Sequence, residues 1–286
     1  MLRLIPLLLL IVSASIGASG EHFAQAEIRS QKLAEGIFML TGQGGNIGVS
    51  AGKDGLLIID DQFAPLADKI QAELNTLHPA SAGRPDYVIN THHHSDHTGG
   101  NRHFAQQGVL MAHRNVRRHL QSEGETDVTA LPVLTFEQGL ELHYNGDTVR
   151  IMHLGPGHTD GDAVILFEQA NVLHMGDLMF KDRFPYIDHQ HGGSVRAYLQ
   201  RIEQVLPWCD DDTKIIPGHG DLADRQDLAR FMLMLQESLD WAQQMSGQPE
   251  AQWHQQGLPS ALENWSWSFI SQERWIDTLW RELQEY

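Results

Sequence analysis

The chain has 286 residues, of which 41% are hydrophobic, and this is enough to bury a sizeable core. Its 20 Lys and Arg residues against 37 Asp and Glu give a formal net charge of −17, which repels polyphosphate backbones and argues against nucleic acid as a partner. A single cysteine, Cys209, excludes an intramolecular disulfide and lies in no motif that would mark it as a nucleophile.

The first 26 residues have the pattern of a secretory signal peptide. Arg3 precedes an apolar run from Leu4 to about Ile16, and small residues follow it. The run is shorter than the roughly 20 residues that span a bilayer, so we expect cleavage, after Gly20 or Ala26, with an uncleaved anchor as the alternative. The sequence therefore predicts a periplasmic or secreted protein with no stable membrane insertion after cleavage.

Residues 27–286 are expected to form a single domain in which short strands alternate with helices. Apolar runs between Gly-rich turns predict strands, and apolar residues at helical spacing predict helices. The predicted strands cover 36–42, 46–52, 55–61, 86–90, 108–113, a hairpin at 139–155 that turns at Asn145-Gly146, 162–168, 171–177 and 213–219. The predicted helices cover 64–78, 195–206 and 222–245. This mixture favours an α+β architecture with a β-sandwich inside and helices outside.

A Trp-rich segment, residues 247–286, is predicted to be a C-terminal helical extension. It carries Trp253, Trp265, Trp267, Trp275 and Trp280. We expect these rings to pack the extension onto the body of the domain, with a substrate lid or a dimer contact as the alternatives.

The segment "THHHSDHTGG", Thr91–Gly100, follows a predicted buried strand and is the main chemical signal in the chain. Alternate residues of an extended backbone face the same way, so His92 and His94 can point to one side while His93 points elsewhere. Asp96 and His97 follow as the backbone turns, and we expect residues 98–100 to open a helix. One short loop can therefore offer ligands to two metal ions.

Three other segments place a possible ligand in a Gly-rich turn at or after an apolar strand. They are "GPGHTDGD", "HMGDLMF" and "IIPGHG", which contain His158, Asp177 and His219. In this order and context, the residues resemble the complete two-metal ligand set of the metallo-β-lactamase superfamily. The resemblance covers nearly all of the chain after the signal segment, and it implies a four-layer αββα sandwich.

The resemblance also implies a role for each residue. The first metal would be held by His92, His94 and His158, and the second by Asp96, His97 and His219. Asp177 would bridge the two ions, as in the glyoxalase II and lactonase branches, whereas the best-known zinc β-lactamases have cysteine or serine there. Asp60 would accept a hydrogen bond from a histidine ligand and fix its tautomer.

These roles predict a metal-dependent hydrolase of small molecules. Two zinc ions per chain, with iron or manganese as alternatives, could share a water and lower its pKa from about 15.7 towards about 7. Asp96 would be the catalytic residue that orients this hydroxide. The expected reaction opens an amide, ester or thioester bond, with a β-lactam or lactone slightly favoured.

Three other functions stay open at this point. A glyoxalase II-like thioesterase would need a basic patch, for which Lys181, Arg183 and Arg196 are few candidates. An iron-dependent oxidoreductase and a non-catalytic zinc-binding protein are the others. The sequence leaves the oligomeric state open.

For residues 184–191 the sequence leaves two interpretations open, a position beside the site or an ordinary loop. "FPYID", Phe184–Asp188, could form a wall of the pocket or a turn packed by aromatic rings. For His189 and His191 we favour a solvent-exposed loop over the mouth of a pocket. His153 and His174 lie within or beside apolar strands, and we expect them in the core.

Overall fold

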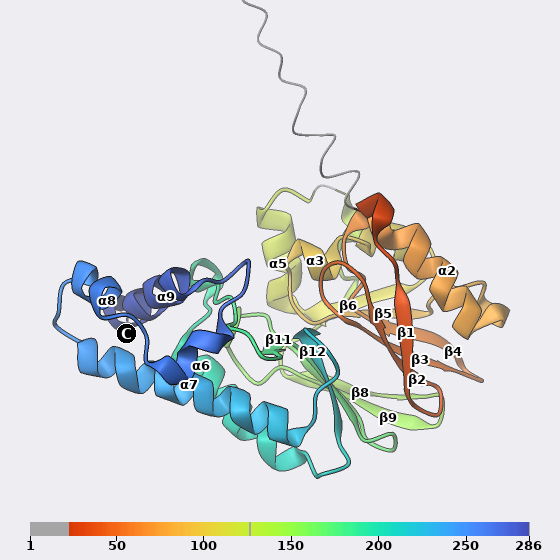
Figure 1. Ribbon diagram of the computed structural model, residues 1–286. Helices are drawn as coiled ribbons and strands as arrows, with labels where there is room; N and C mark the ends of the chain where they lie inside the picture. The colour runs from red at the N-terminus through yellow and green to blue at the C-terminus, as the bar shows by residue number, and fades with distance from the viewer. Residues whose placement is uncertain (1–22, 126, 286) are drawn as a thin grey trace, which may run out of the picture.

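The computed structural model describes residues 23–125 and 127–285, so most of the predicted signal segment, residues 1–22, lies outside the described residues. Two β-sheets face each other (Figure 1). The first sheet has the strand order β1 (Arg29–Ala34), β2 (Ile37–Thr41), β3 (Ile47–Gly52), β4 (Gly55–Ile59), β5 (Tyr87–Asn90), β6 (Val109–His113) and β7 (Leu134–Phe136). The second has the order β12 (Lys214–His219), β11 (Val172–Phe180), β10 (Val164–Phe167), β9 (Asp147–Met152) and β8 (Gly139–Tyr144).

Helices cover the outer face of each sheet (Figure 1). The helices along the first sheet are α2 (Ala67–Leu77), α3 (Ser95–Thr98), α4 (Asn101–Phe104) and α5 (Arg114–Ser122). The helices along the second are α6 (Val195–Val205) and α7 (Arg225–Met245), and α8 (Glu250–Gln256) and α9 (Gln272–Glu285) pack on these helices. The four-layer αββα sandwich expected from the sequence is thus confirmed.

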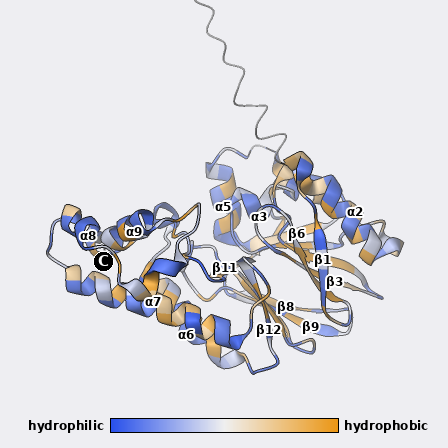
Figure 2. Cartoon of the chain, in the orientation of Figure 1, coloured by the Kyte–Doolittle hydropathy of each residue, from blue (hydrophilic) through white to orange (hydrophobic). Residues whose placement is uncertain are grey.

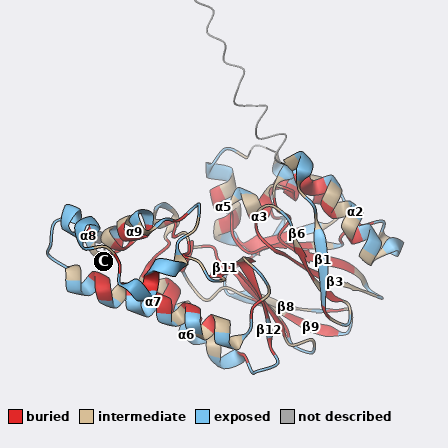
Figure 3. Ribbon diagram, in the orientation of Figure 1, coloured by how far each residue is buried: buried red, intermediate tan, exposed pale blue. Residues whose placement is uncertain are grey.

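The strands alternate between two apolar layers, as the two-residue period of a β-strand requires. In β4, Leu57 and Ile59 lie in the layer between the sheets, while Leu56 and Ile58 lie in the layer against α2. A third apolar layer joins the second sheet to α6, α7 and α9. Figure 2 shows hydrophobic residues along the strands, and Figure 3 shows that the same strands are buried.

The C-terminal segment packs on α7, which confirms the interpretation of its tryptophans as packing residues. Trp253 and Trp275 are fully buried. The Trp253 ring lies against Trp241 of α7 at 5.2 Å between ring centroids, and Trp275 Nε1 donates to Ser238 Oγ at 3.0 Å. Trp267 is an exception, because it lines the cavity described below.

The main differences from the predicted elements occur where residues pack in ways that the local pattern does not indicate. β1, β7 and α5 were not predicted; β1 is mostly exposed, so it lacks the apolar pattern of a strand. Strand β4 ends at Ile59, because Asp60 has φ of 64°. Residues 98–100 lead into α4, whose N-cap is Gly100, as expected. An unpredicted short helix, α3, begins before it at Ser95, so Asp96 and His97 lie within a helix.

Within the described residues, we find no helix with the length and apolar character needed to cross a bilayer.

Candidate metal centre

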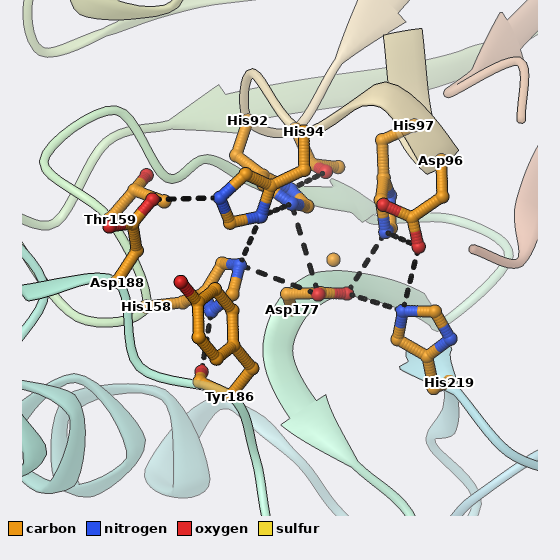
Figure 4. Close-up of polar contacts among 12 residues, drawn as sticks. His92, His94, Asp96, His97, His158, Thr159, Asp177, Tyr186, Asp188 and His219 are labelled. Atoms are coloured by element: carbon orange, nitrogen blue, oxygen red, sulfur yellow. Dashed lines mark hydrogen bonds and ion pairs between the residues drawn. The ribbon is translucent and has the colours of Figure 1, made fainter. Parts of the chain in front are cut away.

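The predicted ligands gather where strands of both sheets end. His92 and His94 follow β5 of the first sheet, and α3 carries Asp96 and His97. The second sheet contributes His158 from the loop between β9 and β10, Asp177 from β11 and His219 from the end of β12. All seven predicted ligands therefore meet at one end of the sandwich (Figure 4).

Three imidazole nitrogens and one carboxylate oxygen form the first group. His94 Nδ1 lies 3.1 Å from His92 Nε2 and 2.9 Å from His158 Nε2. Asp177 Oδ2 lies 3.8 Å from His92 Nε2 and 3.4 Å from His158 Nε2. These separations are near the roughly 3.3 Å edge of a tetrahedron with metal–nitrogen bonds of about 2.0–2.1 Å.

The other nitrogen of each of these histidines has a partner that fixes the tautomer. His158 Nδ1 donates to Tyr186 O at 2.7 Å, and His94 Nε2 donates to Asp188 Oδ2 at 2.9 Å. His92 Nδ1 lies 3.1 Å from Thr91 Oγ1, whose own proton goes to Asp60. The three nitrogens that face one another therefore all carry lone pairs, and such a group is stable around a cation.

The second group consists of Asp96, His97 and His219. His219 Nε2 and His97 Nε2 lie 3.2 Å and 3.6 Å from Asp96 Oδ2. Asp177 reaches this group with its other oxygen, Oδ1, at 3.1 Å from His97 Nε2 and 3.5 Å from His219 Nε2. Figure 4 shows Asp177 between the two groups, with one oxygen toward each.

Asp60 is fully buried and is connected by hydrogen bonds to a histidine of each group. Its Oδ2 accepts from His97 Nδ1 and from Thr91 Oγ1, both at 2.8 Å, and its Oδ1 accepts from Thr91 N at 2.7 Å. It thus orients His97 directly and His92 through Thr91. The expected hydrogen bond from a candidate histidine ligand to Asp60 is present.

The electrostatics of the site favour bound cations. Burial raises the pKa of Asp177, but His97 and His219 outweigh burial and hold it well below its usual range. Burial likewise lowers the pKa of His219, but the Asp177 carboxylate outweighs it and raises this pKa to about 9. His97 Nε2 and Asp177 Oδ1 are buried and have no hydrogen-bond partner among the described residues. A metal ion between them would satisfy both, so the residues present fit a metal centre.

A cavity of about 820 Å³ opens above Asp96, Asp177 and His219. Its other lining residues give it an aromatic wall and include one cationic side chain: Phe63, Phe180, Tyr186, Trp267, Phe269 and Arg274. The Arg274 guanidinium lies over the Phe269 ring at 4.3 Å and over the Tyr186 ring at 5.5 Å.

The segment 184–191 is closer to the site than the sequence indicated. Tyr186, Asp188 and His191 all line the cavity, so "FPYID" provides part of its wall. The exposed loop favoured for His191 is wrong, because His191 Nδ1 donates to Asp188 Oδ2 at 2.7 Å. Asp188, the partner of His94, was not predicted to contact a ligand, since nothing in the local sequence marks that contact.

The remaining predictions concern residues outside the centre. His174 is fully buried, with Nε2 3.1 Å from Asn46 O, and His153 stacks on His113 at 3.9 Å between ring centroids. Cys209 is buried, and burial raises the pKa of its thiol to about 11, which fits a packed residue and not a nucleophile.

Comparison with known proteins agrees with this fold. Residues 41–219 match the family model described as "Metallo-beta-lactamase superfamily". The metallo-β-lactamase type 2 of Bacillus cereus is 24% identical over 172 residues, which are 60% of this chain and 65% of that protein. A hydroxyacylglutathione hydrolase of a Synechococcus strain is 29% identical over 128 residues, 43% of this chain and 47% of that protein. The chain thus spans about half to two thirds of the length of these relatives.

Among solved structures, the crystal structure of the DIM-1 metallo-β-lactamase has a TM-score of 0.63 at 18% identity, covering 74% of this chain and 99% of that one. At this identity the likeness concerns the fold. The family model extends from β2 to the predicted ligand His219 and covers more than half of the chain. On this evidence the chain belongs to the metallo-β-lactamase superfamily.

Proposed function

We propose that this protein is an exported hydrolase that uses two zinc ions to open an amide, ester or thioester bond of a small molecule. The observation that carries the proposal is the position of Asp177, whose two oxygens face two separate ligand groups on the floor of a large cavity. Family membership and the match to known hydrolases support it.

In this proposal one zinc ion is held by His92, His94 and His158. The other would be held by Asp96, His97 and His219, and Asp177 would contribute an oxygen to each. Imidazole and carboxylate donors suit zinc, and they also accept iron or manganese, so the metal is part of what the experiment tests.

When bound, two zinc ions acidify water and polarise the bond under attack. The protein side chains then hold and orient the reactants. Asp96 is partly exposed to the cavity, with its side chain 24% accessible, so its carboxylate can accept a hydrogen bond from the attacking water and take its proton. The aromatic wall excludes bulk water around the scissile bond.

The cavity favours a compact substrate with an apolar ring and one anionic group. Arg274 is the one Lys or Arg among the described residues that line it, and its cation lies against aromatic rings. Lys181, a candidate for a basic patch, instead pairs with Asp227 at 2.7 Å. A β-lactam or a lactone with a carboxylate suits this surface better than a thioester of a large, multiply charged carrier.

A glyoxalase II-like thioesterase is the second candidate. Two observations favour it. The chain is similar to a hydroxyacylglutathione hydrolase, and the residue that faces both ligand groups, Asp177, is a carboxylate. It differs from the first candidate in the leaving group, a thiol in place of an amine or alcohol, so a direct comparison of substrates separates the two.

We also propose that the protein is exported, and contacts of the described part of the N-terminal segment bear on where the signal is cleaved. Lys69 Nζ donates to the carbonyl oxygens of Phe23, Ala24 and Ala26, at 2.7–3.1 Å. Cleavage near residue 20 would keep these contacts, whereas cleavage after Ala26 would remove all three acceptors.

The test is to purify the processed protein after expression in zinc-replete medium, measure its metals, and assay β-lactams, lactones and glutathione thioesters side by side. We expect about two zinc ions in the centre and turnover in at least one substrate class, lost on chelation and restored by zinc. Asp96→Asn should lower kcat strongly, with Asp182→Asn, an exposed carboxylate outside the cavity, as the matched control. A fully metallated protein inactive on all three classes would refute the hydrolase. Full activity with one ion and no gain from added zinc would refute the two-metal proposal, and a native iron content with redox activity would favour an oxidoreductase.

A further inference from the structure

A second histidine cluster lies beside the metal centre, on the side of the "HHH" segment that the centre does not use. The His93 side chain is buried and points away from the two-metal groups, toward α5 and the loop at 189–191. Both of its ring nitrogens are buried without a hydrogen-bond partner. An imidazole in this state costs free energy unless a further group binds it, which indicates that something is missing from its surroundings.

Two more donors face the same space. Glu123 Oε1, just beyond the end of α5, lies 3.3 Å from His93 Nε2 and 3.5 Å from His191 Nε2. These three ligand atoms lie within 4.8 Å of one another. The two measured separations match the roughly 3.3 Å edge of a tetrahedron of zinc ligands.

The tautomer of His191 leaves its facing nitrogen ready to bind a cation. His191 Nδ1 donates to Asp188 Oδ2 at 2.7 Å, so Nε2 carries the lone pair. A lone pair and a carboxylate oxygen 3.5 Å apart repel each other unless a cation lies between them. A carboxylate partner on the far nitrogen is also the usual support for a histidine that binds metal.

We propose that His93, Glu123 and His191 form a third metal site, separate from the two-metal centre, for zinc or a similar divalent transition-metal ion. Two imidazole nitrogens and one carboxylate form a common three-residue donor set for zinc. Glu123 and His191 line the cavity, so the remaining coordination position is open to it and can take water or an anionic group of a ligand.

Asp188 connects this site to the main centre. Its Oδ2 accepts from His191 Nδ1 at 2.7 Å and from His94 Nε2 at 2.9 Å. One carboxylate oxygen thus orients a histidine in each site. The third site is more exposed, because the Glu123 side chain is 45% accessible, and its ion should therefore exchange more readily than the others.

The test compares zinc stoichiometry in the full processed protein, loaded with excess zinc and then desalted into buffer with a fixed low concentration of free zinc. Wild type should hold one more zinc ion per chain than Glu123→Gln and one more than His191→Gln. Glu125→Gln, which alters a carboxylate near Glu123 that contacts Arg102, should behave as wild type. The difference of one ion is informative whatever the main centre holds, and thermal melting checks that each variant is folded.

A location is needed as well, because the exposed group of Glu250, His254 and Asp277 could also bind zinc. Anomalous scattering at the zinc absorption edge from wild-type crystals should show a peak about 2.0–2.2 Å from His93 Nε2, His191 Nε2 and a Glu123 oxygen. His254→Gln should leave that peak and the stoichiometry unchanged. Equal zinc content in wild type and Glu123→Gln, or an additional peak at His254 alone, would overturn the proposal.

Discussion

Asp60→Asn tests whether the hydrogen bonds behind the metal groups control metal affinity. The substitution keeps the shape of the side chain but replaces one acceptor oxygen with an NH2 group. If the NH2 takes the position of Oδ2, it faces His97 Nδ1, which now donates to that oxygen at 2.8 Å. His97 would then have to move its proton to Nε2, the nitrogen that faces Asp177 at 3.1 Å, and a protonated nitrogen cannot bind metal.

The expected size of the effect follows from the contact that is lost. A hydrogen bond to a charged group contributes about 1.5–3 kcal/mol, and loss of an outer partner of a metal ligand typically lowers affinity by about 10–100-fold, which agrees with that range. We expect a loss of this size for the ion held by Asp96, His97 and His219. The ion held by His92 should be affected less, because Asp60 reaches His92 only through Thr91.

The assay is a competition titration of zinc against chelators of graded affinity, with thermal melting as a check of folding. Asp61→Asn is a matched control, because Asp61 is equally buried and its carboxylate accepts from Gly100 N at 2.8 Å. Only its backbone N–H, which the substitution keeps, contacts a candidate ligand, donating to His97 O at 3.0 Å. Wild-type affinity for both ions in Asp60→Asn, or an equal loss in Asp61→Asn, would refute the reasoning.

Four further predictions follow from contacts described above. Asp177→Ala should weaken both ions, that of the second group more than that of the first, measured by the same titration, and wild-type affinity for either ion would contradict a bridging role. Asp177→Cys should shift turnover toward β-lactams relative to lactones. Gly218→Ala should lower the affinity for both ions, because the added Cβ would lie 1.9 Å from Asp177 Oδ1, and an unchanged zinc titration would contradict this. Intact mass of the secreted protein should show an N-terminus near residue 21, and a start at residue 27 would show that the Lys69 contacts are dispensable. Burial and the neighbouring His153 lower the pKa of His113 to about 4. As the pH falls below about 6.5, His113 therefore becomes protonated in the unfolded chain, whereas in the folded chain it stays neutral down to a pH of about 4. Stability should therefore fall by roughly 1 kcal/mol between pH 7 and pH 5.5 on account of this residue, and denaturant titrations should show a smaller fall in His113→Gln.

The seven ligand candidates could be predicted because they lie in Gly-rich segments within or just after apolar strands. Parallel strands such as β4, β5 and β6, or β11 and β12, place such ends at the same edge of a sheet. The order of elements around them is also typical of the family, so the sandwich could be predicted together with the site.

The surroundings of these ligands could not be predicted in the same way. Asp188 and Glu123 approach the "HHH" segment from positions 94 and 30 residues away from the histidines they contact, and no local pattern encodes such pairs. α5, which leads to Glu123, has only two apolar residues, Val116 and Leu120, so few positions mark it as a helix. His191 was predicted to lie in an exposed loop, but its polar side chain contacts Asp188 at the cavity wall.

Each ligand group combines residues from both sheets. The first joins His92 and His94, after β5, to His158, and the second joins Asp96 and His97, in α3, to His219 at the end of β12. An ion bound there is a cross-link between the two halves of the sandwich, and its binding free energy adds to the free energy of unfolding. The supply of the metal that binds there would thus affect how long the protein lasts as well as its activity. Chains that fold without this metal would open more often at this end, and in a protease-rich compartment they would be degraded first.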